Sequence, residues 1–187
     1  MKKLNFQEVW KPALILAAIC LIITSALAGT DALTKGPIAE LAEQNEIATR
    51  QTVLPLAEKF EALPSSGLEN IPYYGTDSSG SVVGYVLITE GKGYGGTITV
   101  MTGISTEGVI TGVSILNNGE TVGLGANCTK DSFTSQYTGT SADQTLTVTK
   151  STPADGEIQA LTGATITSKA VTAAVQQALT DYASIAK

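Results

Sequence analysis

The sequence contains no histidine and only two cysteines, Cys20 and Cys128. The absence of histidine removes the commonest general base, the usual partner of a nucleophilic serine and the commonest metal ligand. Two cysteines cannot form a four-thiolate cluster, and Cys20 lies in an apolar run far from Cys128, so we expect neither a metal site nor a disulfide. We therefore expect no catalytic residues, and chemistry that is supplied by a cofactor.

Aromatic residues are also scarce. They make up 5% of the 187 residues, against 43% for all hydrophobic residues, so a core must rely on Val, Ile, Leu and Ala. The net charge is −6, and the first residues are basic, which leaves the remainder more acidic still. An acidic surface repels phosphate backbones and anionic lipid headgroups. The composition therefore argues against nucleic-acid binding and against peripheral docking on a membrane.

An uncharged, mostly apolar stretch follows the basic start. Residues 12–30 contain no charged side chain, and a helix of about 20 apolar residues can cross a bilayer. We expect one transmembrane helix over 12–30, with Trp10 at the membrane interface. A cleaved signal peptide is the alternative, because Ala26-Leu27-Ala28 resembles a cleavage site.

The lysines at the start of the chain suggest an orientation. Lys2, Lys3 and Lys11 precede the span, and positive residues are retained on the cytoplasmic side. We therefore expect residues 1–11 in the cytoplasm and the following domain outside it, in a single-pass protein of the cell membrane.

The rest of the chain divides into a helical connector and a domain. Residues 31–66 are predicted to be an amphipathic helical connector, because apolar residues recur at helical spacing over 34–63, where Pro55 marks a break or kink. Residues 67–187 are predicted to form the domain. Its strand-like runs, rich in Val, Ile and Thr, cover 81–90, 97–104 and 109–116, with a further strand at 145–149.

The domain is predicted to end in a helix over 167–185. Val171, Val175, Leu179 and Tyr182 lie on one stripe of that helix. The short spacings between the strands favour an antiparallel meander. The predicted fold class is therefore α+β, an antiparallel sheet with helices packed on one face, preceded by one transmembrane helix.

Two glycine-rich segments lie between the predicted strands. Residues 91–96 formally match G-x-G-x-x-G, but a strand follows where a dinucleotide site needs a helix, so we interpret them as a hairpin turn. In residues 121–126, Gly123 and Gly125 flank Leu124, which lets the backbone approach a flat ligand while the leucine packs on it. An ordinary loop explains this second segment equally well.

Residues 161–171 combine a glycine-containing turn with hydroxyl residues at the start of the final helix. Unpaired amides at a helix N-terminus attract anions. Thr167 or Ser168 is predicted to cap the helix. A capped helix without a ligand is the alternative.

Thr162-Gly163-Ala164-Thr165, followed by Thr167-Ser168, resembles the flavinylation motif of the FMN-binding domain family. That family includes the G subunit of the Rnf complex and the C subunit of the sodium-pumping NADH:quinone reductase. The resemblance extends to Gly93-Tyr94-Gly95-Gly96 and to Glu120-Thr121-x-Gly123-Leu124-Gly125. It implies that Thr165 carries FMN as a phosphoester, installed by a flavin transferase that uses FAD and magnesium. The other cofactor-binding residues that it implies are Tyr94, Gly95, Glu120, Thr121, Gly123, Leu124, Gly125, Thr162, Gly163, Ala164, Thr167 and Ser168.

Three residues depart from the family pattern. Gln159 stands where the family often has Asp, Asn118 where it often has His, and Val122 where it usually has Pro. These departures bear on the detailed flavin contacts, and Gln159 also bears on recognition by the transferase.

The compact length resembles the Rnf G subunit more than its longer sodium-pump counterpart. The resemblance implies an electron-transfer subunit with covalent FMN in a membrane ferredoxin:NAD oxidoreductase that couples electron transport to sodium or proton translocation. Such a subunit works with other membrane subunits, exchanges electrons with ferredoxin and NAD only indirectly, and has no catalysis of its own. The alternatives are a free-standing flavinylated carrier for extracellular electron transfer, the C subunit of a sodium-pumping reductase, and a flavin-free binding module.

Overall fold

The computed structural model describes residues 6–64, 67–68 and 70–186. Its contacts divide the chain into two units, Met1–Gln44 and Asn45–Lys187. Most of the first unit belongs to helix α1 (Phe6–Val53). The other described elements lie in the second unit, which contains both hydrophobic clusters.

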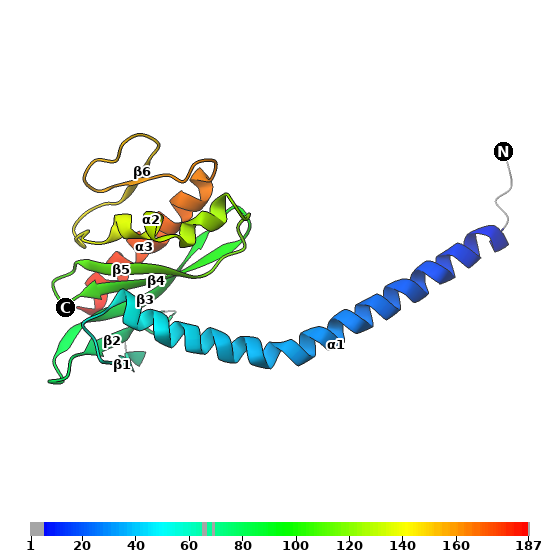
Figure 1. Ribbon diagram of the computed structural model, residues 1–187, viewed down its shortest axis with the longest axis horizontal. Helices are drawn as coiled ribbons and strands as arrows, with labels where there is room; N and C mark the ends of the chain where they lie inside the picture. Colours follow the sequence, from blue (N-terminus) through cyan, green and yellow to red (C-terminus); the bar gives the residue numbers. More distant parts are fainter. Residues whose placement is uncertain (1–5, 65–66, 69, 187) are drawn as a thin grey trace. The chain divides into compact units, whose positions relative to one another are not determined.

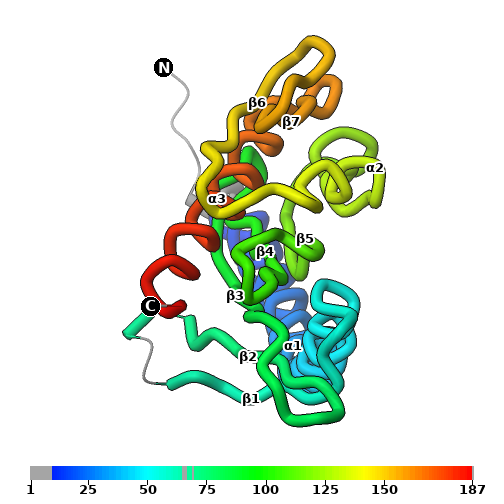
Figure 2. Tube along the Cα trace, turned by 90° about the vertical axis from the view of Figure 1, so that its left-hand side faces the viewer, coloured from blue at the N-terminus to red at the C-terminus, as the bar shows by residue number. Residues whose placement is uncertain are grey.

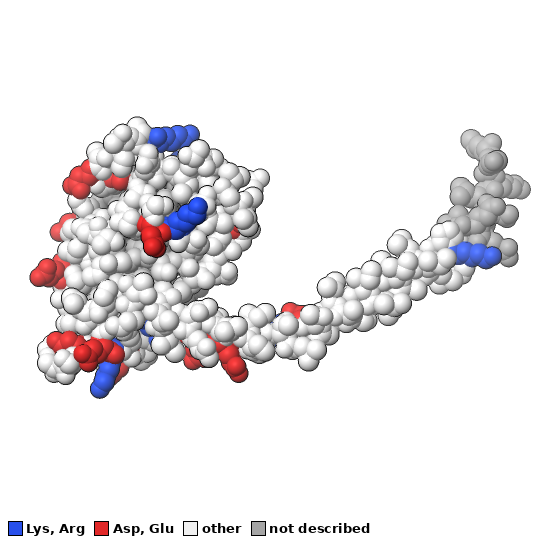
Figure 3. All heavy atoms as spheres, in the orientation of Figure 1, with Lys and Arg blue, Asp and Glu red and all other residues white. Residues whose placement is uncertain are grey.

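Helix α1 has the length and composition of a membrane span. Its most apolar window has a mean hydropathy of 2.3, and none of that window is buried. No charged side chain interrupts the helix between Lys11 and Asp31 (Figure 3). An exposed apolar helix of this length fits a single-pass membrane protein.

The end of α1 differs from the prediction. The helix stops at Val53, so the helix expected over 34–63, and with it the helical connector expected over 31–66, is wrong beyond that residue. Pro55 lies in the turn that follows, because proline lacks the N–H that would continue the helix. Residues 59–62, which were predicted to be helical, form strand β1 (Lys59–Ala62) instead. The apolar residues that recur at helical spacing in this segment are not all buried by the protein, since Ile38 and Leu41 are exposed.

The domain is built on a five-stranded antiparallel meander with the strand order β1-β2-β3-β4-β5 (Figure 1). The strands are β1 (Lys59–Ala62), β2 (Tyr73–Thr76), β3 (Val82–Lys92), β4 (Thr97–Ser105) and β5 (Ile110–Asn117). Strands β3, β4 and β5 confirm the predicted runs and their antiparallel pairing, while β1 and β2 were not predicted. The long β3–β4 hairpin, paired from Gly84↔Ser105 to Lys92↔Thr97, carries the turn 93–96 at its tip.

Helix α3 (Thr165–Ile185) covers one face of this sheet. The predicted stripe of Val171, Val175, Leu179 and Tyr182 is buried against it, together with Val100 of β4. The Thr89 hydroxyl donates a 2.8 Å hydrogen bond to the carbonyl of Ala174 and holds the helix on β3. The fold class is therefore confirmed, and α3 is the helix that covers this face.

The other face of the sheet is covered as well, which was not expected. Val53 and Leu54, at the end of α1, pack with Val86 and Met101 in a second cluster. Figure 2 shows α3 and this end of α1 on opposite sides of the strands. The approach is close because the sheet has glycine here: a Cβ on Gly103 would overlap the carbonyl oxygen of Val53.

Short elements connect β5 to α3 and lie beside the start of that helix. They are the 3-10 helix η2 (Gly125–Thr129), α2 (Asp131–Thr134), the 3-10 helix η3 (Ser135–Tyr137), β6 (Thr147–Thr149) and β7 (Glu157–Gln159). Strand β6 lies within the strand predicted over 145–149, but it pairs in parallel with β7, which was not predicted. The turn after β7 leads directly into α3.

Candidate functional site

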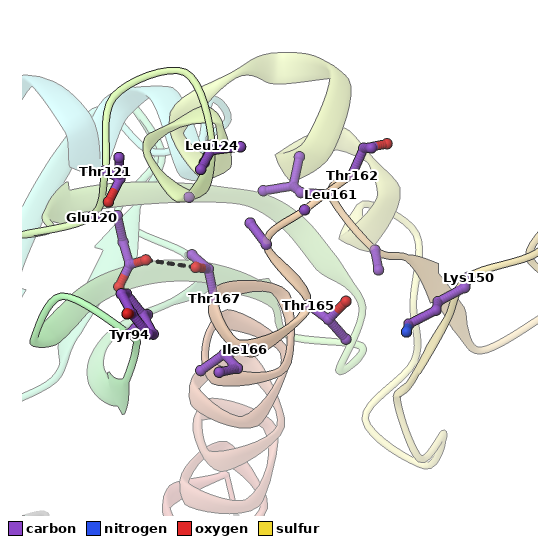
Figure 4. A pocket seen from close by; sticks show the side chains of 14 residues that line it. Tyr94, Glu120, Thr121, Leu124, Lys150, Leu161, Thr162, Thr165, Ile166 and Thr167 are labelled. Carbon is purple, nitrogen blue, oxygen red and sulfur yellow. Dashed lines mark hydrogen bonds between the residues drawn. The ribbon is translucent and has the colours of Figure 1, made fainter.

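A cavity of about 710 Å³ opens at the N-terminal end of α3. Its walls come from the β3–β4 turn, the loop after β5, the end of β6 and the turn between β7 and α3 (Figure 4). This volume lies within the range of cofactor sites. Ten of the thirteen residues expected to bind a cofactor line it, namely Tyr94, Glu120, Thr121, Leu124, Gly125, Thr162, Gly163, Ala164, Thr165 and Thr167.

The turn before α3 is held in place by the helix itself. Gly163 adopts a φ of 76°, which favours glycine, and the Ala164 N–H donates to the carbonyl of Leu161 at 3.0 Å. The buried Ser168 hydroxyl accepts from the Leu161 N–H at 2.9 Å and donates to the carbonyl of Ala164 at 3.0 Å. Ser168 therefore fixes the turn from behind and does not line the cavity.

The predicted cap of α3 is wrong. The helix begins at Thr165, so Thr167 and Ser168 lie inside it, and the N-cap residue is Ala164. In the described part of the chain, no side chain caps the amides of its first turn. Amides of this kind favour an anion at the helix N-terminus.

Thr165 occupies the first position of α3. Its side chain is half-buried and lines the cavity, and its hydroxyl forms no hydrogen bond with the residues that the structure describes. In Figure 4 this hydroxyl lies on the side of the helix that faces Lys150. A nucleophilic oxygen, uncapped helix amides and a lysine thus border one part of the cavity.

The opposite wall contains a buried carboxylate. Glu120 is 8% exposed, and it accepts hydrogen bonds from the Thr167 hydroxyl at 2.6 Å and from the Gly95 N–H at 2.9 Å. Burial alone would raise the pKa of Glu120, but these hydrogen bonds and one from the Tyr94 amide outweigh burial and hold the pKa below its usual value. The carboxylate is therefore ionised at neutral pH.

Exposed apolar side chains border the cavity. Tyr94 is 77% exposed, Leu124 47% and Ile166 55%, although all three line the cavity. Large apolar side chains left open beside a cavity are typical of a binding site for a partly apolar ligand.

Gly95, Gly123 and Ser168 do not line the cavity, although they were predicted to bind the cofactor. Gly95 donates its N–H to Glu120, whereas Gly123 has a φ of 81° and forms the bend of its loop. The glycine of this loop that permits a close approach is Gly125, where a Cβ would overlap the carboxylate of Glu120. Gly95 and Gly125 thus make room for other parts of the protein, whereas a Cβ added to Gly123 would meet nothing within 4 Å.

Four lining residues were not predicted, namely Lys150, Ala160, Leu161 and Ile166. Lys150 is the only cationic residue among the described residues that line the cavity. It directly follows β6, so its position depends on how β6 packs and not on a local motif. Leu161 and Ile166 lie in the segment 161–171, which the sequence analysis had already singled out, so their place beside the site could have been predicted from that segment.

The three departures from the family pattern lie outside the cavity lining. Asn118 accepts from the N–H of Glu120 at 3.2 Å, and the N–H of Gln159 donates to Gln136 at 2.8 Å. Val122 is 91% exposed. Asn118 therefore supports the loop of Glu120. Val122 is an exposed residue of the same loop, and Gln159 is bonded to Gln136.

Comparison with known proteins identifies both parts of the chain. Residues 93–180 match the FMN-binding domain, and residues 1–53 match the RnfG N-terminal region. The solved structure of the C subunit of the Na(+)-translocating NADH-quinone reductase from Parabacteroides distasonis is similar, with a TM-score of 0.58 and 20% identity over 76% of this chain and 83% of that one. At this identity, the structural likeness establishes the fold.

Curated relatives are more similar in sequence. The G subunit of the Na(+)-translocating ferredoxin:NAD(+) oxidoreductase complex of Acetobacterium woodii is 41% identical over 99% of this chain and 97% of its own length. The G subunit of the proton-translocating ferredoxin:NAD(+) oxidoreductase complex of Clostridium ljungdahlii is 36% identical over 88% of this chain and 86% of its own. The chain therefore belongs to the family of G subunits of ion-translocating ferredoxin:NAD(+) oxidoreductase complexes, and it contains that family's FMN-binding domain.

Proposed function

We propose that this chain is the electron-transfer subunit of a membrane-bound ferredoxin:NAD oxidoreductase that couples electron transport to sodium or proton translocation, and that it carries one FMN through a phosphate ester on Thr165. The relatives named above support the complex. The observation that carries the attachment is the position of Thr165, whose hydroxyl lines the cavity at the uncapped start of α3. A phosphate on this oxygen would lie where the helix amides favour negative charge.

The cavity fits FMN in two respects. The phosphate of FMN would be held by the first-turn amides of α3 and by Lys150, which lines the same cavity. Its ring would be bordered by the exposed apolar side chains of Tyr94, Leu124 and Ile166. The bound flavin supplies the redox chemistry, and the chain supplies its position and surroundings.

The attachment requires a separate enzyme, a flavin transferase that uses FAD and magnesium. Thr165 is half-buried and lines an open cavity, so the transferase can reach it. Electrons pass between this chain and other membrane subunits of the complex, and ferredoxin and NAD exchange electrons with it only indirectly. Copurification with multi-span subunits separates this function from that of a free-standing flavinylated carrier.

The direct test is the intact mass of the full-length chain purified from membranes of its own cells. The expected mass exceeds that of the chain by one FMN less one water, because the transferase would move the FMN part of FAD to the Thr165 hydroxyl and release AMP. Fragmentation should place the addition on the peptide that contains Thr165. A chain of unmodified mass would contradict covalent attachment.

We further propose the following arrangement in the membrane: residues 1–11 lie in the cytoplasm, a span covers 12–30, and the residues that follow lie outside the cytoplasm, namely a connector that begins at residue 31 and the FMN domain, whose first strand is β1. The charge pattern supports it, because Lys2, Lys3 and Lys11 precede the apolar stretch. Within the proposed connector, the helix ends at Val53.

Cysteine labelling in intact cells is expected to report this orientation. Ser78 is exposed in the turn between β2 and β3, whereas Cys128 is fully buried, so it need not be removed. A Ser78→Cys chain should react with a membrane-impermeant thiol reagent before lysis. The wild-type chain, which retains Cys20 and Cys128, is the control for background labelling. Reaction only after lysis would place the domain in the cytoplasm.

A further inference from the structure

Three sequence segments of the site meet at one side chain, Glu120. The carboxylate accepts from the Gly95 N–H of the β3–β4 turn and from the Thr167 hydroxyl in the first turn of α3 (Figure 4). Its own loop is fixed by Asn118, whose side-chain oxygen accepts from the N–H of Glu120. The β3–β4 turn, the loop after β5 and the start of α3 are thus joined through this carboxylate.

The glycines of these segments leave room for the carboxylate. A Cβ on Gly93 would overlap one carboxylate oxygen of Glu120, and a Cβ on Gly125 would overlap the other. The Cβ on Gly125 would also overlap the Thr167 hydroxyl, which lies 2.7 Å from the same position. The carboxylate therefore fills a space that the surrounding backbone keeps open, and this makes it part of the cavity wall.

The charge of Glu120 is stabilised by hydrogen bonds and not by an ion pair. Neither of the two salt bridges found among the described residues includes it. The titratable groups that face it are Tyr94 from the β3–β4 turn, Cys128 from η2 and Lys150 on the cavity lining. Burial raises the pKa of the Cys128 thiol, and the charge of Glu120 raises it further, so that thiol stays neutral. Lys150 is the single cation of this set.

We propose that Glu120 is a positioning residue whose negative charge lowers the reduction potential of the FMN bound in this cavity, while its hydrogen bonds hold the cavity's three segments together. A fixed charge in a partly desolvated wall opposes the addition of electrons beside it, and the effect falls slowly with distance at low dielectric. This inference rests on the proposed function, in that FMN occupies the cavity.

The test replaces Glu120 with its neutral isostere in the full-length, flavin-loaded chain in detergent. During reduction with dithionite at neutral pH, in equilibrium with a reference dye, the ratio of reduced to oxidised flavin in Glu120→Gln should be roughly tenfold higher than in wild type. The matched control is Glu107→Gln, since Glu107 is an exposed carboxylate in the β4–β5 turn, and its ratio should equal that of wild type.

The pH dependence separates the charge from a merely structural effect. As the pH falls through the pKa of Glu120, the wild-type carboxylate becomes neutral, so the difference in potential between wild type and Glu120→Gln should shrink. A difference that persisted in acid would come from altered structure and would overturn the proposal. An equal potential in wild type and a flavin-loaded Glu120→Gln at neutral pH would overturn it as well.

A second variant covers the case in which Glu120→Gln does not retain flavin. Thr167→Val keeps the carboxylate and removes one donor to it, so the pKa of Glu120 should rise. The inflection in its potential-against-pH curve should then lie at a higher pH than in wild type. An inflection at the wild-type pH would contradict the proposal.

The flavin-free chain offers a readout that does not depend on the cofactor. Because the folded-state pKa of Glu120 is lowered, its contribution to stability is complete above the unfolded value and is lost as the pH falls through the folded value. Chemical denaturation of the wild-type chain made without transferase should show this acid loss, and Glu120→Gln should lack it. If wild type carried no flavin, the proposed function would fail, whereas this stability measurement would still test the role of Glu120.

Discussion

A Thr165→Val chain is expected to be dark on a denaturing gel under ultraviolet light, whereas the wild-type band fluoresces. Valine has nearly the shape of threonine but no hydroxyl, so the ester cannot form. Thr165 lies at the surface of the cavity, and its hydroxyl forms no hydrogen bond in the described structure, so the loss should leave the fold unchanged. The measurement is in-gel fluorescence combined with the intact mass.

Thr162→Val is the matched control. It makes the same chemical change at a second threonine that lines the cavity, the exposed Thr162 in the turn before α3. Its band should remain nearly as bright as that of wild type. Fluorescence that survived in Thr165→Val would assign the attachment to Thr162 or Thr167.

The same Thr165→Val change should abolish ferredoxin-dependent NAD reduction by the whole complex. The proposed function routes electrons through the FMN on Thr165, so a chain without FMN should interrupt that route. Oxidation of NADH with artificial electron acceptors should continue, because that site belongs to other subunits. Loss of both activities would indicate that the complex had failed to assemble.

The second large effect concerns stability. Gly103→Ala is expected to destabilise the domain by about 3 kcal/mol and to lower its melting temperature by roughly 10 °C. The added Cβ would overlap the carbonyl oxygen of Val53, which also accepts a hydrogen bond from Thr111. Because the obstacle is backbone, the end of α1 must move away from the sheet and open the cluster around Leu54.

Gly36→Ala is the control for this substitution. Gly36 lies within α1, and an added Cβ there meets nothing within 4 Å. Alanine favours a helix over glycine, so the melting temperature of the domain should not fall. Differential scanning calorimetry of the full-length chain in detergent measures both variants. If Gly103→Ala melted at the same temperature as wild type, the close contact between Gly103 and Val53 would add no stability.

The sequence predicted those elements whose hydrophobic pattern extends over many consecutive residues. Strands β3, β4 and β5 are long, rich in Val, Ile and Thr and bounded by glycine-containing turns, and α3 has a full apolar stripe. Strands β1, β2 and β7 contain only three or four residues each, too few for a period to be recognised. The helical spacing over 34–63 continues past Val53, but Pro55, which the sequence had marked as a break, ends the helix there. Leu54 and Ala57 then pack in the second cluster.

The site was predicted through its motifs, and its details depended on packing. The segments around Tyr94, Glu120 and Thr165 do converge on one cavity. Sequence alone could not show that Thr167 donates to Glu120, since the two are 47 residues apart. Lys150 was missed for the same reason, because its place in the cavity depends on how the β6–β7 pair packs.

The two layers that cover the sheet come from opposite ends of the domain's sequence. Val53 and Leu54 precede every strand, and α3 follows them all. During synthesis, strands β1 to β5 therefore leave the ribosome with one apolar face uncovered until α3 emerges. The α3 wall of the cavity forms only then. The proposed attachment of flavin at Thr165 should consequently follow the folding of α3 and should not accompany insertion of the membrane helix.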